Sequence, residues 1–168
     1  MKIKNIMTSK VITFKPDDTM HKALEVFTKS NISGAPVMDG DKLVGLITEL
    51  DIIKVIDIYT PKVHFTSTPH FFLVLAGLKS KSKAAELKKK VMAASKLNIS
   101  DFMTREPVTV DPEADIMEAA RIVDTYKVNR IPVVEKGKLK GIVTRNDIIK
   151  AVAKLEMQFA LNTSEECK

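Results

Sequence analysis

The sequence predicts an α+β fold made of two pseudo-symmetric β-α-β-β-α repeats joined by a helical connector. Residues 3–56 align with residues 99–152 without a gap, and sixteen of the fifty-four aligned pairs are identical. The stretch "GLITELDIIKVI" (45–56) recurs as "GIVTRNDIIKAV" (141–152). Each copy also alternates between short β-branched runs and apolar residues at helical spacing. Two copies of one unit are expected to pack as a pseudo-symmetric pair.

Each repeat begins with a short strand and an amphipathic helix. "VITF" (11–14) is brief and rich in β-branched residues, which favours a strand. Pro16 and Thr19 then supply a helix start, and apolar residues follow at the i, i+3, i+4, i+7 spacing of one buried helix face. These apolar residues are Met20, Ala23, Leu24 and Phe27 in the first copy, and Ile116, Ala119, Ala120 and Val123 in the second.

The second half of each repeat is a β-hairpin followed by a helix. "APVMDGDKLVGLIT" (35–48) indicates a strand, an Asp-Gly turn and a second strand, and residues 131–144 repeat this pattern. The last helix begins at Thr48 in one copy and at Thr144 in the other. Such a unit is too small and one-sided to close its own core, so we expect the two sheets to pack against each other.

The pattern divides the chain into four parts. They are repeat one (1–60), a lysine-rich and mainly helical connector (61–98), repeat two (99–155) and a polar C-terminal tail (156–168).

The connector is expected to form two helices. "STPHFFLVLAG" (67–77) predicts a short helix, because it starts with a capping residue and a proline and ends at a glycine. This segment is apolar nearly all round, so it should be buried, although a short core strand fits as well. "SKAAELKKKVMAASKL" (82–97) predicts a second helix. Its inward residues would be Ala84, Leu87, Val91 and Ala94, with Lys88, Lys89 and Lys90 mostly outward.

The positive charge of the chain is concentrated in the connector. The net charge is +6, yet each repeat is neutral, and residues 57–98 carry eight lysines against Asp57 and Glu86. A nucleic acid or another anionic surface would therefore have to bind there. A solvated face of an amphipathic helix is the more ordinary explanation of these lysines.

Several classes of site are missing from the sequence. The histidines have no other metal-ligand residues at a suitable spacing. No catalytic Ser-His-Asp or Cys-His set is recognisable, and no Gly-rich phosphate loop occurs. We therefore expect neither a metal site nor an enzyme. "FFLVLAG" (71–77) is far shorter than the roughly 20 residues of a membrane span. With Cys167 as the single cysteine, a soluble cytoplasmic protein without a membrane partner is expected.

The repeated Thr-x-x-Asp pattern has two compatible interpretations. Thr48 with Asp51, and Thr144 with Asp147, have the spacing of a capping box, in which both side chains satisfy backbone N–H groups at a helix start. The same groups suit a ligand as well. Helix-start N–H groups and a hydroxyl can bind a phosphate, and a carboxylate can accept from both hydroxyls of a ribose.

These motifs resemble those of the cystathionine-beta-synthase domain, or CBS domain, which occurs in tandem as a CBS pair or Bateman module. The shared order is Met-Thr, a Val-Thr or Ile-Thr strand, a proline before the helix, Pro-Val, and then Gly with Thr-x-x-Asp, and it occurs in both copies. The resemblance implies a regulatory module that binds adenosine-containing ligands, such as AMP, ADP, ATP, S-adenosylmethionine or methylthioadenosine, and that has no cofactor or chemistry of its own. It also implies a homodimer through the repeat helices, whose apolar residues include Ile52, Ile53, Ile56, Ile148, Ile149 and Val152.

The resemblance also implies which residues line two ligand clefts. The first cleft would be lined by Ile12, Thr13, Ala35, Pro36, Thr48 and Asp51. The second would be lined by Arg105, Val108, Thr109, Arg130, Ile131, Pro132, Thr144, Arg145 and Asp147.

The two clefts should differ in charge. Gly34 and Glu49 of the first copy correspond to Arg130 and Arg145 of the second. Arginine can bind a phosphate through two hydrogen bonds, whereas a glutamate repels it.

Three functions are thus open: an adenosyl-ligand sensor that signals to an unidentified protein partner, a nucleic-acid-binding protein that uses the connector with the repeats as a dimerisation platform, and a purely structural assembly module.

Overall fold

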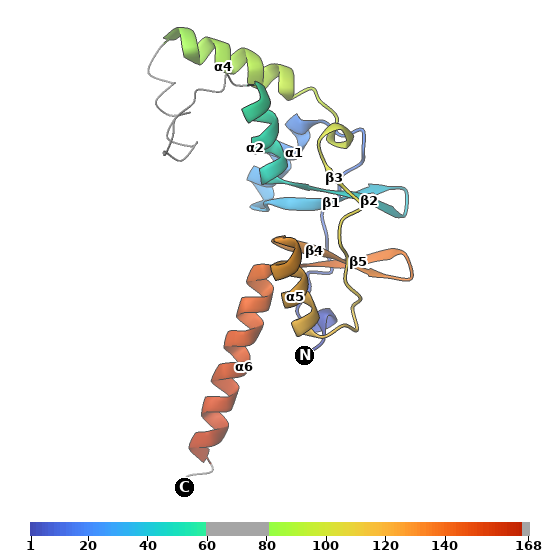
Figure 1. The fold of residues 1–168 in the computed structure, drawn as a ribbon, viewed down its shortest axis with the longest axis vertical. Coiled ribbons are helices and arrows are strands. Elements are labelled where there is room, and N and C mark those ends of the chain that lie inside the picture. Colours follow the sequence, from blue (N-terminus) through green and yellow to red (C-terminus); the bar gives the residue numbers. More distant parts are fainter. Residues whose placement is uncertain (60–80, 166–168) are drawn as a thin grey trace. The chain divides into compact units, whose positions relative to one another are not determined.

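The computed structural model describes residues 1–59 and 81–165, and it has the mixed α+β architecture that the repeats predict (Figure 1). The elements follow in the order 3-10 helix Ile3–Asn5, α1 Met20–Ser30, β1 Gly34–Asp39, β2 Lys42–Thr48, α2 Glu49–Tyr59, α4 Lys81–Ala94, 3-10 helix Ile99–Asp101, β3 Thr104–Arg105, α5 Ile116–Tyr126, β4 Arg130–Glu135, β5 Lys138–Thr144 and α6 Arg145–Glu165. One sheet has the order β1-β2-β3, and the other consists of β4 and β5.

The described residues fall into two compact units. The first unit contains residues 1–13, 36–45 and 105–168, and the second contains residues 14–35 and 46–104. Each unit therefore combines segments from both sequence repeats.

The core of the first unit lies between the β4–β5 hairpin and the helices α5 and α6. β4 pairs antiparallel with β5, and a bulge between Val133 and Val134 shifts the register. Because strand side chains alternate between faces while helix side chains recur every three to four residues, both elements can present one apolar face to this core. The buried cluster consists of Ile3, Val110, Ile116, Ala119, Ile131, Val133, Val143, Ile148 and Ala151.

The first helix of each repeat has a side-chain cap, and the cap at Thr19 is the one that the sequence predicts. The Thr19 side chain accepts a hydrogen bond from the backbone N–H of Lys22 at the start of α1, and Asp115 accepts one from Met117 at the start of α5. α1 and α5 each end at a residue in the left-handed conformation, at Asn31 and the equivalent position in repeat two. The caps satisfy N–H groups that have no partner inside the helix.

The opening segment of each repeat binds to the other repeat. In the first unit the N–H of Ile3 donates to the carbonyl of Ala114 at 3.0 Å. In the second unit the N–H of Ile99 donates to the carbonyl of Asp18 at 2.8 Å. These two hydrogen bonds join equivalent positions of the two copies. The exchange of opening segments is therefore itself pseudo-symmetric, and each unit needs both repeats to complete its core.

Gly141 is required where the N-terminal segment crosses β5. Thr8 and Ile142 exchange backbone hydrogen bonds of 2.9 and 3.0 Å. A Cβ atom on Gly141 would lie 2.8 Å from both the Met7 sulfur and the Thr8 carbonyl oxygen. Glycine at this position allows the close approach of two backbones.

Three local expectations need correction or fall outside the described residues. "VITF" (11–14) does not form a strand, and only Phe14 has a bridge-type pairing. The equivalent residue Val110 makes a single parallel bridge to Val133. The chain contacts the sheet edge at this one residue and then turns away. The strand β3 was not expected. The apolar connector segment 67–77 lies outside the described residues.

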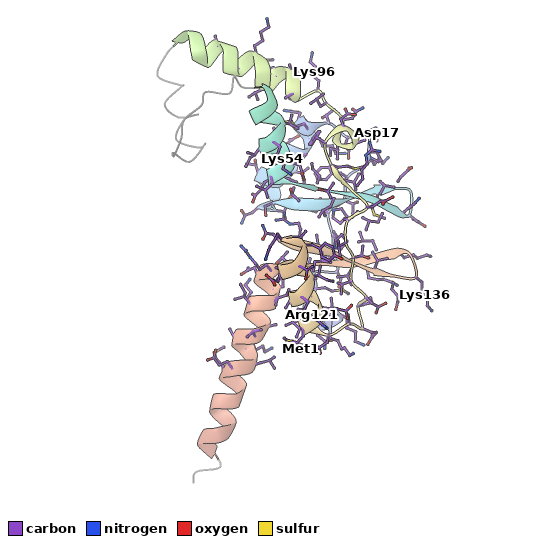
Figure 2. The ribbon with its side chains drawn as sticks, in the orientation of Figure 1. Met1, Asp17, Lys54, Lys96, Arg121 and Lys136 are labelled. Atoms are coloured by element: carbon purple, nitrogen blue, oxygen red, sulfur yellow. The ribbon has the colours of Figure 1, made fainter. Side chains whose placement is uncertain are left out.

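The second predicted connector helix is present as α4. Ala94 is buried and Val91 is half-buried, while Lys88 and Lys89 are exposed, in agreement with the predicted faces. Lys96, just beyond the end of α4, is exposed as well (Figure 2).

Candidate functional site

The second Thr-x-x-Asp motif forms a complete capping box where β5 leads into α6. Oδ2 of Asp147 accepts a hydrogen bond from the Thr144 backbone N–H at 2.8 Å and from the Thr144 hydroxyl at 2.6 Å. The Asp147 N–H donates to the Thr144 hydroxyl oxygen at 3.2 Å. The Thr144 hydroxyl proton is therefore already used. Within residues 1–59 and 81–165, Oδ1 of Asp147 makes no hydrogen bond and could accept from a ligand.

Two residues predicted for the second cleft lie beside this box. Arg130 lies opposite Thr144 in the β4–β5 register, and Ile131 lies opposite Val143. The chain at Val110 runs parallel to β4, since its N–H donates to the carbonyl of Pro132 at 3.1 Å.

The exposure of the cleft residues falls into two groups. Ile131 and Pro132 are fully buried, as expected of sheet core. Val108 is half-buried and Thr109 is exposed.

The three arginines predicted for the second cleft differ in their exposure and in their contacts with the rest of the protein. Arg130 is half-buried, and both it and Arg105 interact with other residues of the chain. Arg145 is exposed at the first position of α6, and its backbone N–H donates to the carbonyl of Asn129 at 2.9 Å. Because that N–H and the N–H of Asp147 are both used, an anion at this helix start would depend mainly on arginine side chains.

The first Thr-x-x-Asp motif is similar but more enclosed. Oδ2 of Asp51 accepts from the Thr48 N–H at 2.9 Å and from its hydroxyl at 2.7 Å. Asp51 is only 5% exposed, and the Lys54 ammonium lies 3.7 Å from its Oδ1. Oδ1 of Asp51 is the counterpart of the oxygen that Asp147 leaves available. Lys54 therefore partly neutralises this oxygen in the first copy.

The remaining residues predicted for the first cleft are divided between the two units. Ala35, in the second unit with Thr48 and Asp51, is buried. Ile12, Thr13 and Pro36 belong to the first unit, where Pro36 is fully buried and Ile12 is 40% exposed.

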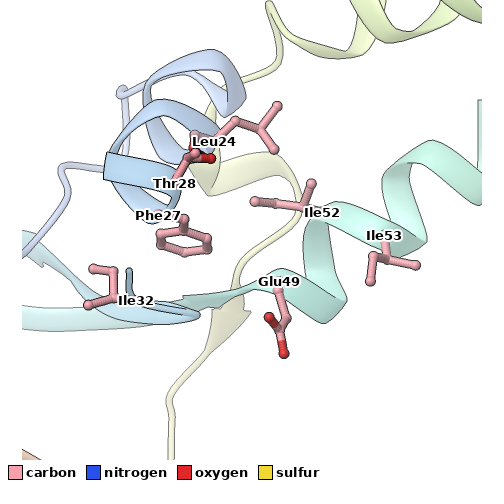
Figure 3. Close-up of a pocket in the computed structure, with 7 residues that line it drawn as sticks. All are labelled: Leu24, Phe27, Thr28, Ile32, Glu49, Ile52 and Ile53. Carbon is pink, nitrogen blue, oxygen red and sulfur yellow. Dashed lines mark hydrogen bonds between the residues drawn. The ribbon is translucent and has the colours of Figure 1, made fainter. Parts of the chain in front are cut away.

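Sequence reasoning missed a second feature, an apolar hollow between α1 and α2. Its volume is about 350 Å³, and Figure 3 shows Phe27 of α1 and Ile52 of α2 pointing toward one another across it. Glu49 contributes a carboxylate to the lining. Leu24, Phe27, Thr28, Ile32, Glu49, Ile52 and Ile53 line this hollow. The sequence signal for this hollow is that α1 and α2 each carry an apolar face, because two such faces on neighbouring helices can enclose an apolar hollow.

No group of His, Cys, Asp or Glu side chains in residues 1–59 and 81–165 could hold a metal ion. None of the helices described there is long and apolar enough to cross a membrane.

A model of the CBS domain family matches residues 3–58 and 99–154, which are the two repeats. An uncharacterised protein of Methanocaldococcus jannaschii is 35% identical over 154 residues, which cover 90% of this chain and 91% of that protein.

Solved structures share the fold. The crystal structure of CBSX2 in complex with AMP superposes with a TM-score of 0.66 at 25% identity, covering 92% of this chain and 98% of CBSX2. The CBS domain pair of protein MJ0100, in complex with 5'-methylthioadenosine and S-adenosyl-L-methionine, superposes with a TM-score of 0.65 at 24% identity. That match covers 92% of this chain and 97% of the other.

Proposed function

The chain belongs to the CBS domain family, and from that premise we propose that it is a regulatory module that senses an adenosine-containing ligand. The candidate ligands are AMP, ADP, ATP, S-adenosylmethionine and methylthioadenosine. Occupancy would change how the repeats pack and would be relayed to a protein partner. The structures of CBSX2 with AMP and of MJ0100 with two adenosyl compounds support this class of ligand.

The observation that carries the proposal is the available carboxylate oxygen of Asp147. Oδ2 is held by Thr144, which fixes the carboxylate, while Oδ1 has no partner within the described residues. A fixed carboxylate with one available oxygen suits two neighbouring ribose hydroxyls, because an ionised carboxylate only accepts hydrogen bonds. The half-buried Val108 and the exposed Thr109 would border the base.

We propose that the second cleft prefers a phosphorylated adenosine. Arg145 is exposed, and its guanidinium makes no ion pair within residues 1–59 and 81–165, so it can turn toward a phosphate. Arg130 lies beside Thr144 and would add a second cation. The first cleft has Gly34 and Glu49 at the equivalent positions, and a carboxylate repels a phosphate, so this cleft would take a neutral or cationic adenosyl group or stay empty.

The module would act as a cytoplasmic homodimer without chemistry of its own. Apolar side chains on the outer faces of α2 and α6 support dimerisation, since Leu50, Ile53, Ile149 and Val152 are each more than half exposed. Large apolar side chains that stay exposed on a helix are typical of interaction sites.

A nucleic-acid-binding function is the second candidate, and the connector favours it. Lys88, Lys89 and Lys96 are exposed in and after α4. Exposed lysines on one segment attract a phosphate backbone, and such binding weakens as salt rises.

Titration calorimetry separates the candidates. The purified protein is titrated in turn with AMP, ATP, S-adenosylmethionine and methylthioadenosine, and RNA and DNA binding is measured at low and physiological salt. Binding of an adenosyl compound that is lost in Asp147→Ala supports the sensor. Salt-sensitive nucleic-acid binding, with no response to any adenosyl compound, supports the second candidate and contradicts the first.

A further inference from the structure

The outer side of α4 combines lysines with an exposed methionine. Lys88, Lys89 and Lys96 are exposed, and Met92 between them is 58% exposed (Figure 2 labels Lys96). Ala85 is exposed on the same side, because residues at i, i+3, i+4, i+7 and i+11 share one side of a helix. These five residues are called the α4 face. It carries three positive charges and no carboxylate, with an apolar side chain at its centre.

The helical turn continues past the last residue of α4 and is anchored to α1. The N–H of Ser95 donates to the carbonyl of Val91 at 2.8 Å, which keeps Lys96 on the same side as Met92. The carbonyl of Ser95 in turn accepts from the N–H of His21, at the start of α1, at 3.0 Å. Both helices belong to the second unit. A surface fixed in this way is preorganised, so binding to it costs little ordering entropy.

An anionic membrane fits the α4 face poorly. A helix that lies in a membrane surface inserts an apolar side and keeps its lysines at the border of that side. The apolar side of α4 is used within the protein, since Ala94 is 1% exposed and Val91 is half-buried. Of the α4 face, only Met92 and Ala85 would be left to insert.

A nucleic acid would use the lysines of the α4 face and leave Met92 exposed. Three lysines neutralise about three phosphates, and such binding loses ~40-fold in affinity between 50 and 200 mM salt. Unpaired bases stack on aromatic side chains or on arginine. The five residues of the α4 face include neither kind. The methionine at the centre is therefore unexplained by a phosphate backbone.

An acidic amphipathic helix uses the whole face. Its carboxylates would pair with the lysines on both sides of Met92, and its apolar side would cover the methionine. Methionine is enriched at protein interfaces, where its flexible side chain adapts to the surface of a partner. The face extends from Ala85 to Lys96, which is about 16 Å of helix. A surface of this size suits a weak and transient contact.

We propose that the α4 face is the docking surface for a protein partner that presents an acidic amphipathic helix. The inference rests on the proposed function in one respect, because it gives the relay to a protein partner a place on the molecule. The surface itself does not depend on which adenosyl compound binds. The lysines are shared with the nucleic-acid candidate, and Met92 is the residue that distinguishes the two.

Fluorescence anisotropy with a designed peptide tests the proposal. The labelled probe is a peptide of about 18 residues, long enough to form a helix in water, with leucines along one side and glutamates on both sides of them. A second peptide has alanines in place of the leucines. Each is titrated with the full chain at physiological salt, without adenosyl ligand. We expect micromolar binding of the leucine peptide and about tenfold weaker binding of the alanine peptide, because the apolar contact is lost.

Substitution of the methionine separates apolar docking from charge attraction. Met92→Ser should weaken binding of the leucine peptide by about fivefold and leave binding of the alanine peptide unchanged. Met157→Ser is the matched control, because Met157 of α6 is 63% exposed and lies outside the α4 face. It should leave both affinities unchanged.

Charge reversal tests the lysines. Lys88→Glu/Lys89→Glu should weaken binding of both peptides by at least about tenfold, because two attractive contacts become repulsive. Lys136→Glu/Lys138→Glu makes the same change of charge at two exposed lysines of the β4–β5 hairpin and should have little effect. Equal losses in the two double variants would mean that only the net charge matters, which overturns the proposal.

The remaining outcomes assign the face differently. No peptide binding leaves a solvated face and overturns the proposal, as does equal binding of the two peptides. A DNA or RNA duplex that binds more tightly than the leucine peptide, with no effect of Met92→Ser, assigns the face to nucleic acid and also overturns it. An adenosyl response in calorimetry without peptide binding contradicts this inference and leaves the proposed sensor intact. Peptide binding without an adenosyl response supports the docking surface and contradicts the sensor.

Discussion

The Thr144 hydroxyl lies 2.6 Å from Oδ2 of Asp147 and donates its proton to that carboxylate. The same carboxylate oxygen accepts from the Thr144 N–H, and the Asp147 N–H returns a hydrogen bond to the hydroxyl oxygen. The motif is therefore a capping box, yet Oδ1 of the same carboxylate makes no hydrogen bond within residues 1–59 and 81–165. A cap that uses only half of its acceptor capacity can also hold a ligand.

Replacing Asp147 with alanine should weaken adenosyl-ligand binding more than it weakens folding. Loss of a cap costs about 1 kcal/mol. Loss of a ribose acceptor leaves ligand hydroxyls without partners, at a cost of ~1–3 kcal/mol in binding. Calorimetry gives the affinity, and urea unfolding gives the stability. Asp51→Ala is the matched control. An unchanged affinity with a lower unfolding free energy would leave capping as the only role of Asp147.

Arg145→Glu should lower the affinity for AMP or ATP and reduce the dependence of binding on salt, because a phosphate loses a cation and gains a like charge. Glu49→Arg should create or strengthen a second phosphate-dependent site. Equal AMP affinity at both clefts of the unmutated protein, resolved by two-site titration, would argue against the asymmetry.

Gly141→Ala should destabilise the first unit by about 1–3 kcal/mol, the usual range for an overpacked site. The new methyl group would meet the Met7 sulfur and the Thr8 carbonyl oxygen at 2.8 Å. The segment at Met7 and Thr8 should then separate from β5. Hydrogen exchange should become faster at the N–H groups of Thr8 and Ile142. Unchanged exchange at both would show that the segment accommodates the methyl group without moving.

The carboxyl of Asp18 should contribute to stability at neutral pH and not in strong acid. Burial raises its pKa, but the hydrogen bond from the Lys15 N–H and the ion pair with Lys22 together hold the pKa below its ordinary value of 3.8. A lowered folded-state pKa gives stability that is present above the unfolded-state pKa and is lost as the pH falls through the folded-state value.

Asp18→Asn should therefore lower the unfolding free energy near pH 7, and the difference from the unmutated protein should shrink as the pH falls to about 2. Urea unfolding at several pH values measures this. Asp17→Asn is the control, because its carboxylate makes no hydrogen bond or ion pair within the described residues. A constant difference across the pH range would exclude the ion pair as the cause.

The sequence by itself determined the repeat, most of the helices and strands and the cap of α1. Thr19 caps its helix as the spacing predicts, and Thr48 and Thr144 each stand one residue before a helix. These features depend on residues within a few positions of each other, so a local pattern carries the information. The family resemblance was likewise visible in short motifs whose order recurs in both copies.

Only the tertiary structure decided which partners those residues have. The exchange of opening segments joins Ile3 to Ala114 and Ile99 to Asp18, and no local pattern encodes a contact over such a separation. The place of Glu49 at an apolar hollow depends in the same way on how α1 and α2 meet. The physical reason is that caps and periodicities are satisfied within one helix or strand, whereas burial, crossing backbones and available acceptor oxygens depend on what the rest of the chain brings alongside.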